Sequence, residues 1–137
     1  MKTPPLRVTL TAIYVMLIVA IVAGANTGIL GAYVGFIHRI PFGDKLFHFL
    51  LIGGLAFFIN WFLHCRSWQI RNCRILVGTA IVAVLSTTEE ISQIWIPNRR
   101  FDIGDLAMNL LGIFILGPLA RHAGPPSSSR ILARWKS

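Results

Sequence analysis

The chain has 137 residues, of which 55% are hydrophobic and only 13% are charged. Soluble globular domains carry roughly 25% charged residues, and a chain this short cannot bury so much apolar surface away from water. Thirteen Lys and Arg stand against five Asp and Glu, giving a formal net charge of +8. The composition therefore argues against a soluble enzyme domain and indicates an integral membrane protein.

The first predicted element is the uncharged apolar run from Val8 to Ala25, whose 18 residues fit a membrane-spanning helix. Residues 26–43 follow it and contain four glycines and a proline. We expect a loop over these residues, with an interfacial stretch near Tyr33 to Ile37. A second apolar run, from Phe47 to Leu63, predicts the second spanning helix.

The second half of the chain predicts two more spanning helices. Residues 64–74 are polar and basic and are expected to form a loop. The third run extends from Ile75 to Ile96 and stops before a proline, and the fourth extends from Leu106 to Ala120. Residues 1–120 are thus expected to form one all-α, four-helix transmembrane domain. Residues 121–137 are rich in Gly, Pro, Ser and basic residues and predict a flexible basic tail.

The distribution of basic residues predicts the orientation in the membrane. With four spans, the two termini and the second loop share a side, which carries nine Lys and Arg against four on the other side. Because basic residues accumulate in cytoplasmic loops, both termini are expected in the cytoplasm. The same count explains the high net charge without a nucleic-acid partner, since the basic residues do not form a patch on a soluble face. Membrane lipids are the expected partners.

All five acidic residues fall at the predicted outer end of the bundle, although they come from three separate regions of the sequence. These residues are Asp44, Glu89, Glu90, Asp102 and Asp105. An ionisable residue inside a membrane is expensive and is therefore a functional-site hypothesis by default.

The start of the second helix places three polar residues on one face. Asp44 is a candidate N-cap, because its carboxylate can accept from the free N–H groups of the first turn. His48 follows Asp44 at i+4 and Lys45 at i+3, so the three side chains can meet. Lys45 can also simply extend to the lipid headgroups.

The third helix carries a polar stripe near its outer end. Ser86 and Gln93 lie on nearly one line of the helix, and Glu89 and Glu90 flank that line on either side. Helical geometry alone does not choose which glutamate faces the bundle. Either glutamate can serve a functional site or pair with basic residues, among them Arg99, and hold the bundle together.

The fourth helix is expected to begin with Asp102 as N-cap and Asp105 at the third helical position. Asp105, Asn109 and Gly112 then form one stripe, in which the glycine permits close helix approach. Asn109 needs a polar partner inside the membrane, for which Gln93 or Glu90 is the expected candidate. Arg99 or Arg100 can grip a phosphate or carboxylate, or one of them can only neutralise Glu90.

These residues form three blocks whose order and spacing carry a resemblance. The blocks are Asp44-Lys45-x-x-His48, then Glu90-x-x-Gln93, then Pro97-x-Arg99-x-x-Asp102-x-x-Asp105-x-x-x-Asn109-x-x-Gly112. With them the chain resembles the VanZ-like family, small bacterial membrane proteins named for a teicoplanin-resistance factor. The resemblance implies a multi-pass protein of the bacterial cytoplasmic membrane and a link to cell-envelope traits. It does not imply one biochemical activity.

Two functional hypotheses follow. In the first, the outer cluster binds or modifies an envelope lipid or a lipid-linked anionic group. His48, Glu90 and Asp105 would then supply acid–base chemistry, and the binding residues would be Asp44, Lys45, Gln93, Arg99, Asp102 and Asn109. A divalent cation on Glu90, Asp105 and His48 is conceivable, but the sequence sets no geometry for it, so neither a metal nor another cofactor is predicted.

In the second hypothesis the chain is a non-catalytic accessory subunit of a larger membrane complex or homo-oligomer, and the cluster is structural. A transporter or channel is less favoured, because the acids gather at one surface and do not line a path through the membrane. Whether the protein is an enzyme is left open.

Overall fold

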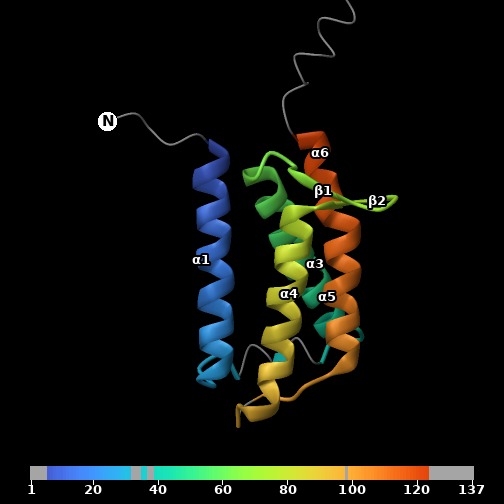
Figure 1. The fold of residues 1–137 in the computed structure, drawn as a ribbon. Helices are drawn as coiled ribbons and strands as arrows, with labels where there is room; N and C mark the ends of the chain where they lie inside the picture. Colours follow the sequence, from blue (N-terminus) through green and yellow to red (C-terminus); the bar gives the residue numbers. More distant parts are fainter. Residues whose placement is uncertain (1–5, 32–34, 37–38, 98, 124–137) are drawn as a thin grey trace, which may run out of the picture.

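The structure is a computed structural model that describes residues 6–31, 35–36, 39–97 and 99–123. Its helices run alongside one another in a bundle (Figure 1). The long elements are α1 (Leu6–Asn26), α3 (Gly43–Phe62), α4 (Val77–Ser92) and α5 (Ile103–Leu116). The short elements are strands β1 (Ser67–Ile70) and β2 (Cys73–Leu76), 3-10 turns η1 (Gln93–Trp95) and η2 (Gly117–Leu119), and helix α6 (Ala120–Ala123).

Three of the helical segments are long and apolar enough to cross a membrane. They are Leu6–Asn26, Gly43–Phe62 and Ile103–Ala123, the last of which joins α5, η2 and α6. The helix α4 has 16 residues, which at roughly 1.5 Å per residue is shorter than the roughly 30 Å hydrocarbon core. The structure therefore shows a mostly helical, membrane-type protein with three candidate spans, where the sequence predicted four.

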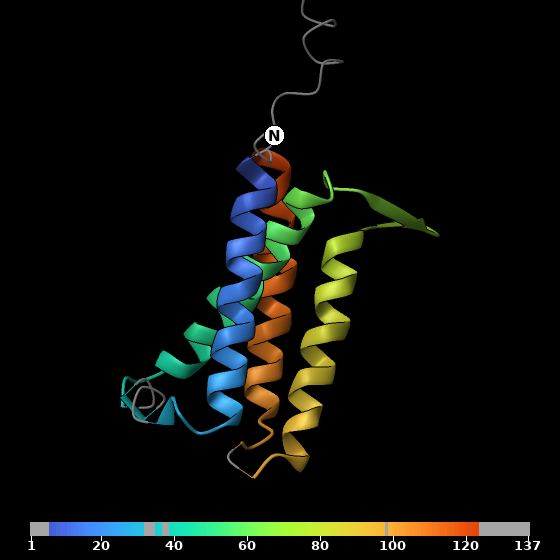
Figure 2. The same cartoon turned by 90° about the vertical axis from the view of Figure 1, so that its left-hand side faces the viewer.

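Successive helices run in opposite directions, which gives the bundle two distinct ends (Figures 1 and 2). One end holds the start of α1, the β1–β2 hairpin and α6, and we refer to it as the hairpin end. The other holds the first turn of α3, the last turn of α4 and the first turn of α5. Because all five acids lie there, we refer to it as the acidic end.

Helix α3 lies at the centre of the packing and contacts α1, α4 and α5. The core is formed by Ala56 of α3, Val82 of α4 and Ile113 of α5, all almost completely buried. The backbones of α3 and α5 approach closely at two glycines, as the sequence predicted for Gly112. A Cβ at Gly53 would lie 2.8 Å from the Gly112 carbonyl, and one at Gly112 would overlap the Phe49 carbonyl oxygen.

A buried polar contact lies in the half of the bundle nearer the hairpin end, and the sequence did not predict it. The Asn60 side chain is completely buried. Its Nδ2 donates to Thr79 Oγ1 at 2.9 Å and to the Gly117 carbonyl at 3.3 Å, and its Oδ1 accepts from the Thr79 backbone N–H at 3.2 Å. One amide thus connects α3, α4 and η2, and its only sequence signal is an asparagine in an apolar run.

The predicted loop at 64–74 is wrong, because this segment forms an antiparallel hairpin. Ser67 pairs with Leu76, and Ile70 pairs with Cys73 across a two-residue turn. Arg71 in the turn has a φ of 52°, as tight hairpin turns require. Consequently α4 begins at Val77 and not at the predicted Ile75.

One other predicted boundary also shifts. The third helix was expected to reach Ile96 but ends at Ser92 and tightens into the 3-10 turn η1. The fourth helix starts at Ile103, directly after Asp102, which confirms the predicted N-cap, although the apolar run begins only at Leu106. Most of the interfacial stretch near Tyr33 to Ile37 and most of the basic tail lie outside the described residues.

Candidate functional site

The first turns of α3 supply one group of residues to the acidic end. The helix begins at Gly43 after Phe42, whose φ of 60° makes the turn into the helix. Asp44 therefore lies inside the first turn, and its predicted N-cap role is wrong. The turn forms earlier because the Gly43 N–H donates to the Ile40 carbonyl at 2.9 Å. The Asp44 carboxylate still lies at the positive end of the helix dipole.

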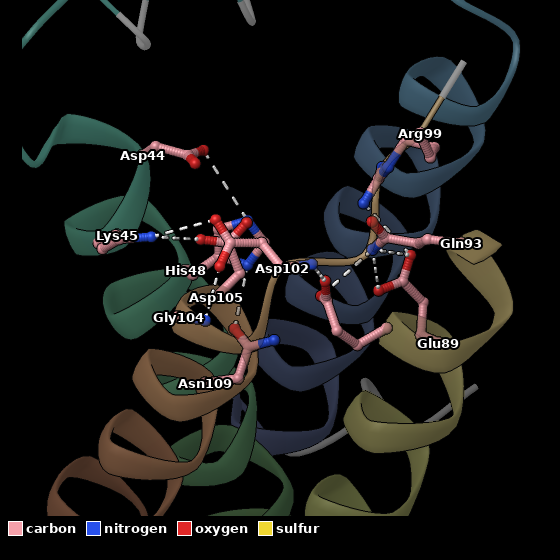
Figure 3. Close-up of polar contacts among 11 residues, drawn as sticks. Asp44, Lys45, His48, Glu89, Gln93, Arg99, Asp102, Gly104, Asp105 and Asn109 are labelled. Atoms are coloured by element: carbon pink, nitrogen blue, oxygen red, sulfur yellow. Dashed lines mark hydrogen bonds and ion pairs between the residues drawn. The ribbon is translucent and has the colours of Figure 1, made fainter. Parts of the chain in front are cut away.

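Lys45 and His48 face the first turn of α5, as Figure 3 shows. Lys45 Nζ lies 3.4 Å from Asp102 Oδ2 and 3.2 Å from Asp105 Oδ1. His48 Nε2 lies 3.6 Å from Asp105 Oδ2 and 3.9 Å from Asp44 Oδ1. Asp105 is thus shared, with one carboxylate oxygen toward the lysine and the other toward the histidine.

The other nitrogen of His48 is held by Asn109. His48 Nδ1 and Asn109 Oδ1 are 3.1 Å apart, and Asn109 is buried. The sequence predicted Gln93 or Glu90 as the partner of Asn109. That prediction is wrong, because the partner is His48. Since an amide oxygen only accepts, Nδ1 carries the proton in this contact. Nε2 is then the nitrogen of His48 that can gain or lose a proton toward Asp105.

Helix α4 turns Glu90, and not Glu89, into the bundle. Glu90 is fully buried, whereas the Glu89 side chain remains 30% exposed. The buried face of α4 decides this, because Val82, Ser86 and Glu90 are all buried and lie four residues apart on that face. The sequence alone left this choice open.

Glu90 is satisfied by neighbours from two other segments. Its Oε1 accepts from the Asp102 backbone N–H at 3.3 Å, and its Oε2 accepts from Gln93 Nε2 at 3.2 Å. Gln93 Nε2 also lies 3.1 Å from Glu89 Oε2. Among the described residues, the buried Ser86 Oγ, one turn deeper in α4, has no hydrogen-bond partner.

The loop between η1 and α5 supplies the arginines. Arg99 Nη2 lies 3.5 Å from Glu89 Oε1, so Arg99 neutralises the outer glutamate. Arg100 is exposed. Figure 3 shows Asp102 between this group and the group around His48, with Glu89, Gln93 and Arg99 on the far side.

Asp102 begins α5 as the sequence predicted. Its Oδ1 accepts from the Gly104 backbone N–H at 2.6 Å. This hydrogen bond, with a smaller contribution from the charge of Lys45, lowers the pKa of Asp102 below its ordinary value. Asp102 therefore caps a helix, pairs with Lys45 and donates its backbone N–H to Glu90.

One set of side chains can hold a cation. Asp44, His48 and Asp105 each offer a ligand atom, and these atoms lie within 4.8 Å of one another. The set differs from the one considered from the sequence, since Asp44 takes the place of Glu90. Lys45 Nζ on Asp105 opposes a cation there, because its charge occupies one of the two aspartate oxygens.

The comparison with known families decides the relationship that the three residue blocks suggested. A family model described as VanZ/LLP1 matches residues 8–121. The chain belongs to the VanZ/LLP1 family. No curated protein and no solved structure gives a match.

The match to the VanZ/LLP1 family spans all four long helices and the whole acidic end. This match confirms the resemblance that the three blocks within residues 44–112 indicated. Every residue of the three blocks that was proposed for the site lies in one polar network around the first turn of α5.

Proposed function

We propose that this VanZ/LLP1 protein binds or modifies an envelope lipid or a lipid-linked anionic group at its acidic end. The observation that carries the proposal is the arrangement around Asp105, which faces a lysine through one oxygen and an oriented histidine through the other. A cation and a proton-exchanging group thus lie side by side at the end of an apolar bundle, and the proposal places this end at the level of the lipid headgroups.

The chemistry assigned to this site starts from His48. With Nδ1 fixed on Asn109, its Nε2 can take a proton from a bound hydroxyl or phosphate group, and Asp105 stabilises the imidazolium that results. Glu90 acts through Asp102, whose backbone N–H it accepts, and so positions the α5 start. The chemistry proposed for the site is therefore binding of the anionic group with proton exchange at His48.

Lys45 is already paired with carboxylates, so an anion must draw its ammonium group away from them in order to bind. Lys45 pairs with Asp102 and Asp105 at 3.2–3.4 Å, and its side chain is 37% exposed. Its flexible stem can turn the ammonium group toward a phosphate at the surface. Arg100, which is exposed in the loop before α5, offers a second positive charge at the acidic end.

The proposed setting is the bacterial cytoplasmic membrane, with the acidic end outward and the hairpin end in the cytoplasm. In this proposal α4 also crosses the membrane and, with the three candidate spans, gives the protein four. Its 16 residues extend about 24 Å, and the three residues of η1 add about 6 Å, which together match the hydrocarbon thickness. A reporter fused after Ser137 tests the orientation, since periplasmic activity there would contradict it.

The functional test compares site variants in cells that lack the chromosomal copy. His48→Ala and Glu90→Gln should reach the membrane in normal amounts and should leave the envelope lipids and lipid-linked precursors as they are in the deletion strain. Thr88→Val, an exposed hydroxyl on the same helix that bonds only its own α4 backbone among the described residues, is the matched control. Normal lipid composition with both site variants would contradict the proposal.

A second candidate function is that of a non-catalytic accessory subunit, and the pairing of the site's charges favours it. Lys45 with Asp102 and Asp105, and Arg99 with Glu89, form the kind of closed network that a structural lock needs. This function predicts co-purification with a larger membrane complex at a fixed ratio in mild detergent. Recovery of the protein only in free form would contradict it.

A further inference from the structure

The β1–β2 hairpin projects sideways from the hairpin end of the bundle, across the direction of the helices (Figures 1 and 2). It connects α3 to α4, and Leu76 at its base is buried. A bundle whose helices cross a membrane would hold such a projection roughly parallel to the membrane surface.

The register of the hairpin separates its residues into two faces. Residues opposite one another share a face, and neighbours along a strand alternate between faces. One face is entirely apolar and consists of Trp68, Ile70, Cys73 and Ile75. The other consists of Ser67, Gln69, Arg74 and the buried Leu76.

The apolar face is uncovered by the described part of the protein. Trp68 is 53% exposed and Ile70 is 54% exposed, both on strand β1. A two-stranded hairpin alone is marginally stable in water. The hairpin therefore needs a surface against which this face can lie.

The surroundings of the hairpin are uniformly basic. Arg66, Arg71 and Arg74 are exposed on it, and Arg7 and Arg121 lie at the same end. None of the five Asp and Glu lies there, because all five are at the acidic end. Arg74 and Arg7 have uncharged partners, Ser67 Oγ at 2.8 Å and His64 Nδ1 at 3.0 Å.

We propose that the hairpin is an interfacial anchor that binds anionic lipid headgroups on the membrane leaflet at the hairpin end. The Trp68–Ile70 face enters the headgroup and acyl boundary, where tryptophan is favoured. Arg66 and Arg71 bind the phosphate groups of anionic lipids, to which basic residues near the surface are attracted. Arg74 lies on the polar face and adds only its positive charge to this end. The inference is independent of the acidic-end site, because it concerns the opposite end of the bundle.

The depth of the apolar face can be measured through a native cysteine. Cys65→Ser leaves Cys73, on the apolar face, as the only cysteine for a spin label in the full chain reconstituted in lipid nanodiscs. A matched protein carries Cys65→Ser, Cys73→Ser and Gln69→Cys, which places the label on the polar face. Oxygen should relax the label at 73 more than a water-soluble nickel chelate does, and the label at 69 should show the reverse.

The charge requirement is tested by the lipid composition. With phosphatidylglycerol in the nanodisc, the label at 73 should lie deeper than with phosphatidylcholine alone. Arg66→Gln with Arg71→Gln and Arg74→Gln should abolish that difference. A label at 73 that meets the chelate as freely as the label at 69 would overturn the proposal. So would a label shielded from both relaxing agents, which would indicate a protein surface on this face, or a lipid dependence that survives the triple substitution.

Discussion

His48 Nδ1 lies 3.1 Å from Asn109 Oδ1, and this contact joins α3 to α5 one turn inside the acidic end. It sets which nitrogen of the histidine faces Asp105. The interaction therefore has a structural consequence, the pairing of two helices, and a chemical one, the direction in which the histidine can exchange a proton.

A double-mutant cycle measures this contact. His48→Ala and Asn109→Ala should show a coupling free energy of about 0.5–3 kcal/mol in thermal or denaturant unfolding of the detergent-solubilised protein, because each removes the other's partner. The matched pair is His48→Ala with Asn60→Ala, whose positions on α3 are about 18 Å apart along the helix. That pair should be additive, and coupling of equal size in both cycles would contradict the direct contact.

Alanine substitution of the two adjacent glutamates should lower the free energy of unfolding by different amounts. Glu90→Ala leaves the Asp102 N–H without its side-chain acceptor and removes one of the two glutamates that accept from Gln93 Nε2, which costs about 1–3 kcal/mol in free energy of unfolding. Glu89→Ala removes a partly exposed pair with Arg99 and should cost about 1 kcal/mol or less. Melting temperatures of the two purified variants test the difference. An equal or reversed order would contradict the assignment of Glu90 as the glutamate that faces the bundle.

The close approach of α3 and α5 should be sensitive to one methyl group. In Gly112→Ala the added Cβ overlaps the Phe49 carbonyl oxygen, so the helices must separate, at a cost of about 1–3 kcal/mol. Gly31→Ala is the control, because a Cβ there meets nothing within 4 Å. Unfolding of both variants in the same detergent checks this, and an unaffected Gly112→Ala would contradict the helix packing.

Asp102 should make stability depend on pH in the acidic range. Its pKa in the folded protein is below the ordinary value, so its stabilisation is complete above the unfolded-state pKa and is lost as the pH falls through the folded-state value. At neutral pH Asp102→Asn should retain the cap, whereas Asp102→Ala should lose about 1 kcal/mol.

The measurement for Asp102 is the melting temperature from pH 7 down to about pH 3. The stability of the wild-type protein relative to Asp102→Asn should decline below about pH 4, where aspartates protonate. Parallel curves for the two proteins over this range would show that the carboxylate is not stabilised in the folded state.

The sequence predicted the helices and the gathering of acids at one end, because apolar runs and uncompensated charges are local signals. The hairpin was missed because its segment is polar and its turns use positive φ at residues such as Arg71 and His64, which side-chain type does not reveal. The partner of Asn109 was also missed. Its contact with His48 joins residues 61 positions apart, and only tertiary packing selects it from several polar candidates.

The choice of Glu90 over Glu89 illustrates the same limit. Each glutamate lies about 100° from its neighbour around the helix, so both flank the polar stripe equally well in the sequence. The choice follows from the buried line through Val82 and Ser86, which depends on how α4 packs against α3 and α5.

The central claim, that the acidic end binds an anionic headgroup, is tested most directly by native mass spectrometry of the protein released from nanodiscs of mixed anionic and zwitterionic lipids. The reference protein and every variant carry Arg66→Gln, Arg71→Gln and Arg74→Gln, which removes anionic-lipid binding by the hairpin. The reference protein should retain anionic lipid preferentially. Lys45→Gln with Arg100→Gln should reduce that retention about tenfold or more, since a hydrogen bond to a charged group contributes about 1.5–3 kcal/mol. Arg39→Gln, which removes an exposed positive charge from the loop before α3, should retain it. Equal retention by the reference protein and the Lys45–Arg100 variant would contradict the claim.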